Sequence, residues 1–398
     1  MTRATPRESR IDHRGVSVAV NPVQLISWIE EGQSHSVRWR SEGGSPPPRK
    51  VLVASDNSMT ADAAYRLACE GTALLWRGDF QNARQLLQAM ARRADAKPRN
   101  KAKPPASLTE AFNLHRLAQS QRARTLGALL IPVEADYGIA LRRAPDLHEA
   151  IAEGWGASGE ASVTSLRELL GLNGAHEWRK KGVEIAALGG RIHPHYGVFS
   201  PVRGEYITLV ASAPLPQDAL KLAFDIGTGT GVLAAVLARR GVAHVIATDQ
   251  DPRAIACANE NIARLGLAGQ VEVLQADMFP PGRAPLIICN PPWVPARPSS
   301  PLEHAIFDPE SRMLRAFVGG LAAHLAPDGE GWLILSDLAE HLGLRSRDTL
   351  LALVETSGLR LLGRSDMKPH HPKASDAVDP LYAARKAEVT SLWRLGVA

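Results

Sequence analysis

Asp225-Ile-Gly-Thr-Gly-Thr-Gly231 is the stretch that decides the fold of this chain. An apolar strand pattern over 223–226 runs into it, and a helical pattern over 231–240 follows it. Glycine has no Cβ, so a glycine-rich turn bends sharply and lets a ligand approach the backbone closely. The alternative is a tight turn that binds nothing. A glycine turn between a strand and a helix is typical of an α/β ligand-binding domain.

The spacing of these glycines argues against a dinucleotide site, whose fingerprint is G-x-G-x-x-G. Val232 stands where the third glycine of that fingerprint would fall. Asp225, directly at the end of the strand, would repel a pyrophosphate but would suit a cationic ammonium group. We therefore expect a cofactor with an amino-acid part, bound by the loop that spans Gly227, Thr228, Gly229, Thr230 and Gly231.

Strand and helix patterns alternate on both sides of the glycine loop, which predicts βαβ units and a parallel sheet. The expected strands are 223–226, 245–248, 271–274, 286–289 and 332–335, with two more at 359–363 and 391–395. The expected helices are 231–240, 252–265, 310–325 and 338–357. A sheet of this kind binds its ligand at the carboxyl ends of its strands.

Two more acids follow such strand ends. Asp249 ends the strand after the glycine loop, where a carboxylate can accept hydrogen bonds from both hydroxyls of a ribose; Gln250 follows it. Asp251-Pro252 then reads as a helix cap with proline in the first turn. Asp277 ends the third strand and is placed to accept from an adenine amino group, with Met278 against the ring.

A second motif, Asn290-Pro-Pro-Trp293, ends the strand over 286–289. Proline cannot donate to a sheet, so the strand stops there. The Asn290 side-chain oxygen and the Pro291 carbonyl can both accept from a planar NH2 group. They would aim its lone pair at an electrophile, with Pro292 fixing the turn and Trp293 stacking on the planar group. The alternative is a proline-rich loop with a tryptophan that plugs the core.

Together these motifs resemble the class I S-adenosylmethionine-dependent methyltransferases, over about 195–398. The Asn-Pro-Pro-aromatic signature is similar to that of amino-methyltransferases: adenine-N methylases of nucleic acids, small-domain RNA guanine-N methyltransferases, and protein-glutamine methyltransferases that modify release factors. Tyr196–Glu205 resembles the Gly-Val-Phe-Ser segment of the small-domain enzymes, and Pro201-Val-Arg203 resembles a segment of the release-factor enzymes. The resemblance implies S-adenosyl-L-methionine as the cofactor and Asn290 and Pro291 as the residues that grip the acceptor.

The N-terminal part has no catalytic signature. Residues 60–93 and 108–130 carry helical spacing, and a basic linker over 92–105 lies between them. That linker and the arginines that follow it suit either a phosphate backbone or a solvated loop. We therefore predict an α/β chain: a mainly helical N-terminal domain over 1–182, with a possible role in substrate recognition, followed by a Rossmann-like class I methyltransferase domain over 183–398.

Composition limits the cellular setting. The chain has 398 residues, a net charge of +5 and only three cysteines. No apolar run reaches the length of a membrane span, and no secretory signal is recognisable. The cysteines and histidines lack metal-ligand spacing. We expect a cytoplasmic protein without a metal ion or a membrane partner.

Three functions remain open. The first is N-methylation of an exocyclic base amine in a nucleic acid, with RNA favoured by the basic stretch. The second is N-methylation of a protein glutamine, which needs no basic channel. The third is a catalytically silent module that binds the cofactor and a partner; the intact Asn290-Pro-Pro-Trp293 argues against it.

Overall fold

The computed structural model describes residues 9–11, 17–19, 23–96, 104–157, 159–298, 303, 305–369 and 379–398. The chain divides into two compact units: a first unit of 1–94, 125–148 and 158–169, and a second unit of 95–124, 149–157 and 170–398. The predicted single boundary between 182 and 183 does not coincide with this division, because the chain passes between the units several times.

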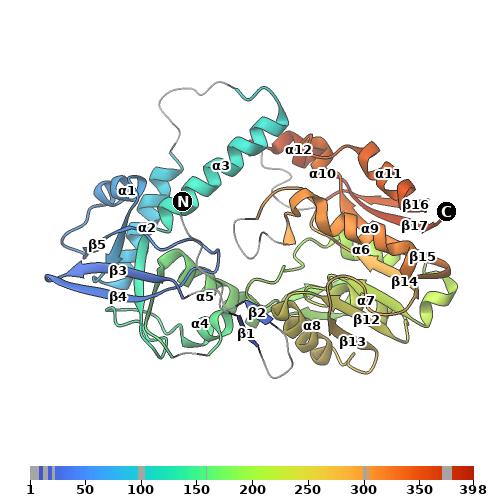
Figure 1. Ribbon diagram of the computed structural model, residues 1–398, viewed down its shortest axis with the longest axis horizontal. Helices are drawn as coiled ribbons and strands as arrows, with labels where there is room; N and C mark the ends of the chain where they lie inside the picture. Colours follow the sequence, from blue (N-terminus) through green and yellow to red (C-terminus); the bar gives the residue numbers. More distant parts are fainter. Residues whose placement is uncertain are drawn as a thin grey trace. The chain divides into compact units, whose positions relative to one another are not determined.

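The second unit is built on a seven-stranded sheet with the order β13-β12-β11-β14-β15-β17-β16 (Figure 1). The strands are β11 (Ala223–Ile226), β12 (Val245–Asp249), β13 (Val271–Gln275), β14 (Ala284–Cys289), β15 (Leu325–Ser336), β16 (Leu359–Met367) and β17 (Thr390–Val397). β11 to β15 run parallel, and β17 is antiparallel to both of its neighbours. All seven predicted strands are confirmed.

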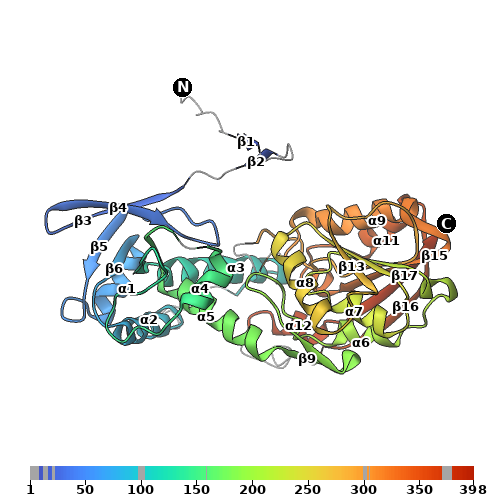
Figure 2. The same ribbon diagram turned by 90° about the horizontal axis from the view of Figure 1, so that it is seen from below.

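Helices cover both faces of this sheet, as Figure 2 shows. One face packs against α6 (Glu205–Ser212) and α7 (Val232–Arg239), the other against α9 (Arg312–His324) and α11 (Arg347–Thr356). Alternate residues of β14 serve the two layers: Leu286 and Ile288 face α7, whereas Ile287 and Cys289 face α9. The Rossmann-like fold predicted for this region is confirmed.

Strand β11 lies between β12 and β14, and the chain runs outward from it in both directions. This is the switch point of a doubly wound sheet, where the strand ends leave a crevice for a ligand. The helix that follows β12, α8 (Pro252–Arg264), begins as expected: the Asp251 side chain accepts from the Arg253 backbone N–H at 2.9 Å. The predicted helix over 338–357 is two helices, α10 (Leu338–His341) and α11.

Further elements complete the second unit. They are α3 (Leu108–Leu126), α4 (His148–Trp155), α5 (Leu166–Lys181), the hairpin β9 (Val183–Ile185) and β10 (Gly190–Ile192), and α12 (Tyr382–Ala387). α3, α4 and α5 each have their larger part in this unit. Phe112 of α3 is buried in a cluster with Val294, Leu342 and Leu381, which explains why a helix from the N-terminal half belongs here.

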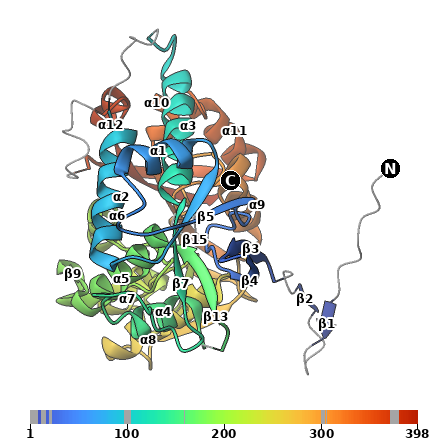
Figure 3. The same cartoon turned by 90° about the vertical axis from the view of Figure 1, so that its left-hand side faces the viewer.

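The first unit holds a six-stranded mixed sheet with the order β3-β4-β8-β7-β6-β5, accompanied by α1 (Ala61–Cys69) and α2 (Phe80–Ala94), the blue helices of Figure 3. Its strands are β3 (Leu25–Glu30), β4 (Gln33–Trp39), β5 (Lys50–Ala54), β6 (Thr72–Trp76), β7 (Leu129–Val133) and β8 (Ser162–Ser165). A separate hairpin pairs β1 (Ser9–Ile11) with β2 (Ser17–Ala19).

This sheet corrects the prediction of a mainly helical N-terminal domain. Leu74 and Leu75, assigned to a helix from their spacing, lie in β6, which is buried from Ala73 to Trp76. A strand buried on both faces shows no alternation, so its apolar run looks like a helical segment. The helix expected over 108–130 ends at Leu126, and its last part is the start of β7.

Candidate active site

The glycine loop has the backbone that its sequence predicted. Gly227, Gly229 and Gly231 have φ angles of +71°, +55° and +79°, a region that side chains with a Cβ rarely adopt. A Cβ on Gly229 would meet no atom within 4 Å, so this position faces open space. A Cβ on Gly227 would collide with the Met313 methyl group. The loop therefore lets a ligand lie against its backbone at Gly229.

Asp225 lies behind this loop. Its Oδ2 accepts from the Thr228 hydroxyl at 2.6 Å and from the Ala234 backbone N–H at 3.0 Å, and burial raises its pKa to about 6. It does not line the cavity described below. The predicted direct contact of Asp225 with an ammonium group does not match this position, because both of its bonds hold the loop to the start of α7.

Gly231 also lies away from the cavity lining. A Cβ there would lie 3.3 Å from the Cα and Cβ of Ala258 in α8. The residue allows α7 and α8 to pack closely, and this packing replaces the ligand contact expected from its place in the motif.

Asp249, at the end of β12, faces the loop. Its Oδ2 accepts from the Gly229 backbone N–H at 3.0 Å and its Oδ1 from the Asp251 N–H at 3.0 Å. Burial raises the pKa of this carboxyl group. Asp277, at the end of β13, is more open and forms an ion pair with Arg312 at 3.1 Å. Met278 adopts a φ of +82°, and its carbonyl accepts from the Thr248 hydroxyl at 2.6 Å.

These strand ends surround one cavity of about 670 Å³. Most of the predicted site residues line it: Gly227, Thr228, Gly229, Thr230, Asp249, Gln250, Asp277, Met278, Asn290, Pro291, Pro292 and Trp293. Other residues in the lining were not predicted, among them Arg203, Tyr206, Arg312, Met313, Leu338 and Arg385. The size is in the range of pockets that hold small-molecule ligands.

Trp293 has a different relation to Asn290 from the one that its sequence suggested. Its indole N–H donates to the Asn290 Oδ1 at 2.9 Å. The Arg203 guanidinium carbon lies 4.8 Å from the centre of the Trp293 rings. The side chain is half-buried and packs against three apolar clusters. These contacts engage the indole N–H and the ring face under Arg203, so only the other face of Trp293 is left to stack on an acceptor in the cavity.

Arg203 is held from two sides. Its Nε donates to Glu205 at 2.6 Å and its Nη2 to Glu388 at 3.0 Å, and both carboxylate side chains are at most 4% exposed. The Ser336 hydroxyl also donates to Glu388, at 2.7 Å. Arg203 and Glu205 belong to the segment whose resemblance to known enzymes was noted, but Glu388 is 185 positions away. No local pattern reveals that partner.

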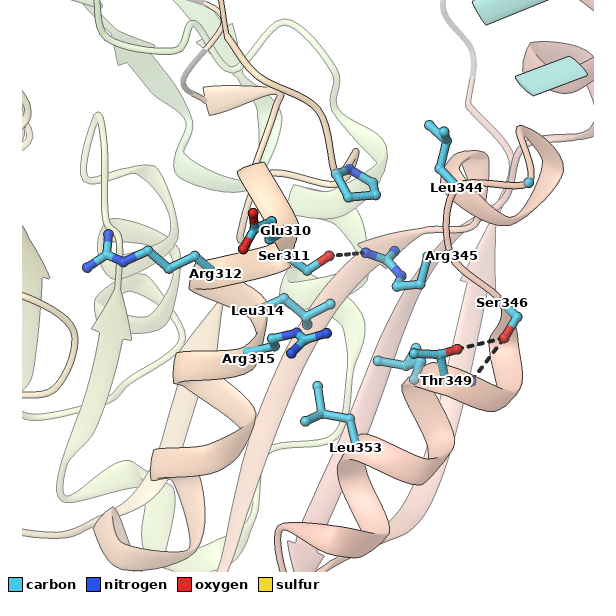
Figure 4. A pocket seen from close by; sticks show the side chains of 13 residues that line it. Glu310, Ser311, Arg312, Leu314, Arg315, Leu344, Arg345, Ser346, Thr349 and Leu353 are labelled. Atoms are coloured by element: carbon cyan, nitrogen blue, oxygen red, sulfur yellow. Dashed lines mark hydrogen bonds between the residues drawn. The ribbon is translucent and has the colours of Figure 1, made fainter. Parts of the chain in front are cut away.

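A second cavity, of about 740 Å³, lies between the first turns of α9 and α11 (Figure 4). Arg345 lines it, points toward Ser311 in Figure 4, and is only 9% exposed. Its Nη2 donates to the Trp293 carbonyl at 3.4 Å. Pro295 lines the same cavity. Arg345 therefore supports the Asn290-Pro-Pro-Trp293 loop from behind, a role the sequence did not indicate.

Helix α3 reaches the same loop region. Phe112 contacts the Phe307 ring edge to face at 6.4 Å between centroids, and the Arg116 guanidinium carbon lies 4.1 Å from the centre of that ring. Arg116 also pairs with Glu303 at 3.0 Å. These contacts join α3 to the chain that follows Trp293.

The basic stretch is partly neutralised. Arg93 pairs with Asp62 at 2.7 Å, Arg122 with Asp95 at 2.6 Å, and Arg116 with Glu303. A guanidinium bound to a carboxylate offers less to a phosphate. Arg92, also in the linker, is exposed in the last turn of α2, whereas Lys97, Arg99, Lys101 and Lys103 lie outside the described residues.

The described part of the chain contains no group of three or more His, Cys, Asp or Glu side chains placed to hold a metal ion. His370 and His371 fall outside that part. The helices that are described there include none long and apolar enough to cross a bilayer.

Comparison with known proteins bears on this site. Residues 189–347 match the family model "Methyltransferase small domain". The chain is 37% identical over 149 residues to a release factor glutamine methyltransferase of Cereibacter sphaeroides, covering 34% of this chain and 51% of that protein. It is 33% identical over 145 residues to a ribosomal protein L11 methyltransferase of Pelotomaculum thermopropionicum, covering 36% of this chain and 39% of that protein. The chain thus spans about half the length of these relatives or less.

Solved structures with a similar course of the chain include a ribosomal protein L11 methylase from Lactobacillus delbrueckii subsp. bulgaricus, at 17% identity and a TM-score of 0.33, covering 50% of this chain and 82% of that chain. Another is a methyltransferase from Thiobacillus denitrificans in complex with S-adenosyl-L-homocysteine, at 16% identity and a TM-score of 0.34, covering 50% and 92%. The family assignment rests on the sequence matches. Residues 189–347 are therefore similar to the methyltransferase small-domain family, and this part of the chain has the fold of a class I S-adenosylmethionine-dependent methyltransferase domain.

Proposed function

We propose that this chain transfers a methyl group from S-adenosylmethionine to the side-chain amide nitrogen of a glutamine in a protein. We choose this acceptor because Trp293 already donates its indole N–H to Asn290 and has Arg203 over one ring face. A purine base in a methylase pocket depends on stacking between flat side chains. An aliphatic amide needs hydrogen-bond acceptors and no stacking platform. The loop offers acceptors at Asn290 and Pro291, while the face of Trp293 beneath Arg203 is closed.

The cofactor side of the cavity fits S-adenosylmethionine. Gly229 has no side chain and faces open space, and the half-buried Asp249 carboxylate lies beside it with oxygens that can accept from ribose hydroxyls. Asp277 and Met278 would meet the adenine, and Gly227, Thr228 and Gln250 would line the remainder. When bound, S-adenosylmethionine supplies an electrophilic methyl group.

On the acceptor side, the difficulty is that an amide nitrogen shares its lone pair with the carbonyl group. Asn290 Oδ1 and the Pro291 carbonyl would accept hydrogen bonds from the two N–H groups of the acceptor amide. These bonds would fix the nitrogen and stabilise the positive charge that develops on it. The surplus proton leaves to solvent after the N–C bond has formed. This chemistry requires no strong base next to Asn290.

The nucleic-acid acceptor favoured by the sequence has less support. Three arginines of the stretch that suggested it are paired with carboxylates. The relatives named above are, by their names, methyltransferases of a release factor and of a ribosomal protein. We also propose that the chain acts in the cytoplasm, since Cys69, Cys257 and Cys289 are all free thiols.

The test is incubation of the protein with methyl-labelled S-adenosylmethionine and fractionated bacterial lysate, followed by RNase or protease. We expect label that survives RNase and is released by protease. Label released by RNase would establish the base acceptor instead. Cofactor binding without any labelled fraction would point to the silent module.

A further inference from the structure

Arg203 joins three parts of the acceptor side that are distant in sequence. Its guanidinium lies over the rings of Trp293, and its nitrogens donate to Glu205, at the start of α6, and to Glu388, just before β17. Because Ser336 at the end of β15 also donates to Glu388, the contact is anchored to the sheet itself. The Arg203 side chain is 21% exposed, and its two ion pairs restrain its movement over the ring.

Such a contact fixes the plane of the indole. A guanidinium over an aromatic face is attracted to the ring, and more strongly when the pair is shielded from water. Two buried carboxylates direct the plane of the guanidinium, since its donors form a rigid fork. Trp293 is therefore held both by its apolar neighbours and by an oriented cation.

The indole in turn fixes Asn290. An asparagine amide has two orientations related by a half-turn, one with Oδ1 and one with Nδ2 on a given side. The Trp293 N–H is a donor only, so the orientation with Nδ2 toward it would set two donors against each other. Only the orientation with Oδ1 toward the indole satisfies both groups, at 2.9 Å. A phenylalanine ring has no donor and would leave the two orientations nearly equal.

We propose that Arg203 is a positioning residue for methyl transfer: held by Glu205 and Glu388, it orients Trp293, whose indole N–H selects the amide orientation of Asn290 that receives the acceptor nitrogen. The inference rests on the proposed function, because the orientation of Asn290 matters for transfer only if Asn290 holds the acceptor NH2 group.

A double-mutant cycle tests this chain of contacts. The variants are Arg203→Met, Trp293→Phe and the combination, and the readouts are the single-turnover rate of label transfer and the Kd of S-adenosylhomocysteine. Loss of one hydrogen bond predicts a roughly tenfold lower rate for Trp293→Phe. Loss of the cation predicts about a threefold to tenfold lower rate for Arg203→Met. The Kd should stay within about twofold in each, since neither change removes a cofactor contact.

The decisive result is the combined variant. If Arg203 acts through the indole N–H, Arg203→Met lowers the rate no further in a Trp293→Phe background. The same loss in both backgrounds would overturn the proposal, because Arg203 would then act without Trp293. Arg203→Lys, which keeps the charge but not the flat fork, should fall between wild type and Arg203→Met, and it replaces that variant if Arg203→Met fails to fold.

A matched control comes from the first unit. Arg77 also pairs with a glutamate, Glu30 at 2.7 Å, and lies 6.0 Å from the rings of a tryptophan, Trp28. Arg77→Met should leave the transfer rate unchanged. A loss equal to that of Arg203→Met would show a general loss of stability and would overturn the positioning role.

A spectroscopic readout separates this inference from the proposed acceptor. The Trp293 indole N–H gives an NMR resonance that Trp293→Phe identifies, and its shift reports the bond to Asn290. We expect it to move in both Asn290→Ala and Arg203→Met. The transfer rate is measured on the active lysate fraction whatever acceptor it contains, so a base acceptor would overturn the proposed function and leave the cycle valid. An unmoved resonance in Arg203→Met would overturn the positioning role even if glutamine is methylated.

Discussion

The two sides of the central cavity are built in different ways. The cofactor side is made largely of backbone, with glycines of positive φ and their N–H groups. Its main side chain is Asp249, whose carboxylate accepts a hydrogen bond from the Gly229 N–H at 3.0 Å. The acceptor side is made of side chains that support one another, from Glu388 through Arg203 and Trp293 to Asn290. The first arrangement tolerates little change in the turn itself. The second depends on contacts that span 185 positions of the chain.

This difference predicts that variants on the two sides have separable effects: those on the acceptor side lower the rate of transfer, and those on the cofactor side weaken cofactor binding. The largest effect is expected for Asn290→Ala, which removes the oxygen that would hold the acceptor nitrogen. Loss of one preorganised group of this kind lowers kcat by roughly 100-fold to 1000-fold. The Kd of S-adenosylhomocysteine, measured by calorimetry, should change less than about twofold.

Asn290→Asp is the matched comparison, because it keeps one acceptor oxygen toward the Trp293 indole. It should retain more activity than Asn290→Ala if the hydrogen bond from the Trp293 indole to residue 290 contributes to transfer. If Asn290→Ala instead raised the Kd of S-adenosylhomocysteine strongly and left kcat unchanged, the acceptor side and the cofactor side would not have separable effects.

A smaller effect is expected on the cofactor side. Asp249→Ala removes the carboxylate proposed to accept from the ribose hydroxyls, and hydrogen bonds to a charged group contribute about 1.5–3 kcal/mol. The Kd should therefore rise by roughly 10-fold to 100-fold, with the rate at saturating cofactor nearly unchanged. Asp251→Ala is a control, since Asp251 caps α8 and its loss should affect stability more than Kd. Equal Kd values for wild type and Asp249→Ala would exclude Asp249 as a cofactor ligand.

The same residue predicts a pH dependence. Burial raises the pKa of Asp249, and its ionised form is the better acceptor. Cofactor affinity should be highest above that pKa and fall as the pH drops through it. In Asp249→Asn, affinity should be lower at neutral pH and nearly independent of pH. A titration of Kd against pH, with denaturation monitored in parallel, checks this; a pH slope that persists in Asp249→Asn would assign it to another group.

The smallest effect is expected behind the loop, at Asp225. Its pKa is raised from 3.8 to about 6 by burial, so the folded state holds its proton more firmly than the unfolded state. Between these two pH values the unfolded chain binds fewer protons, and stability falls as the pH rises. Above about pH 6 the contribution is constant. Asp225→Asn does not titrate and should flatten that part of the stability curve, measured by urea unfolding. An unchanged slope would mean that Asp225 titrates normally.

The same contrast explains what the sequence could and could not predict. The cofactor side follows from local patterns, so β11, β12 and β13, which lead to Gly229, Asp249 and Asp277, and the switch point beside β11 are all where the sequence indicated. Asp225 and Gly231 belong to the motif but contact other parts of the protein and not the cavity. The motif predicts the turn, but it does not predict which residues of the turn face the ligand.

The acceptor side and the first unit were harder to predict. The use of Trp293 as a donor to Asn290 depends on the position of Arg203, which depends in turn on Glu388 near the end of the chain. In the first unit, β6 is buried on both faces and has no alternating pattern. Its pairing with β7, more than fifty positions later, cannot be deduced from local spacing.

The acceptor nitrogen can be identified by peptide mass spectrometry of the labelled lysate fraction. Fragmentation of the modified peptide locates the transferred methyl group on one atom of one residue. We predict a methyl group on the side-chain nitrogen of a glutamine, and no such group when the Asn290→Ala protein is used. A methyl group on a nucleobase, or on a lysine or terminal amine, would contradict it.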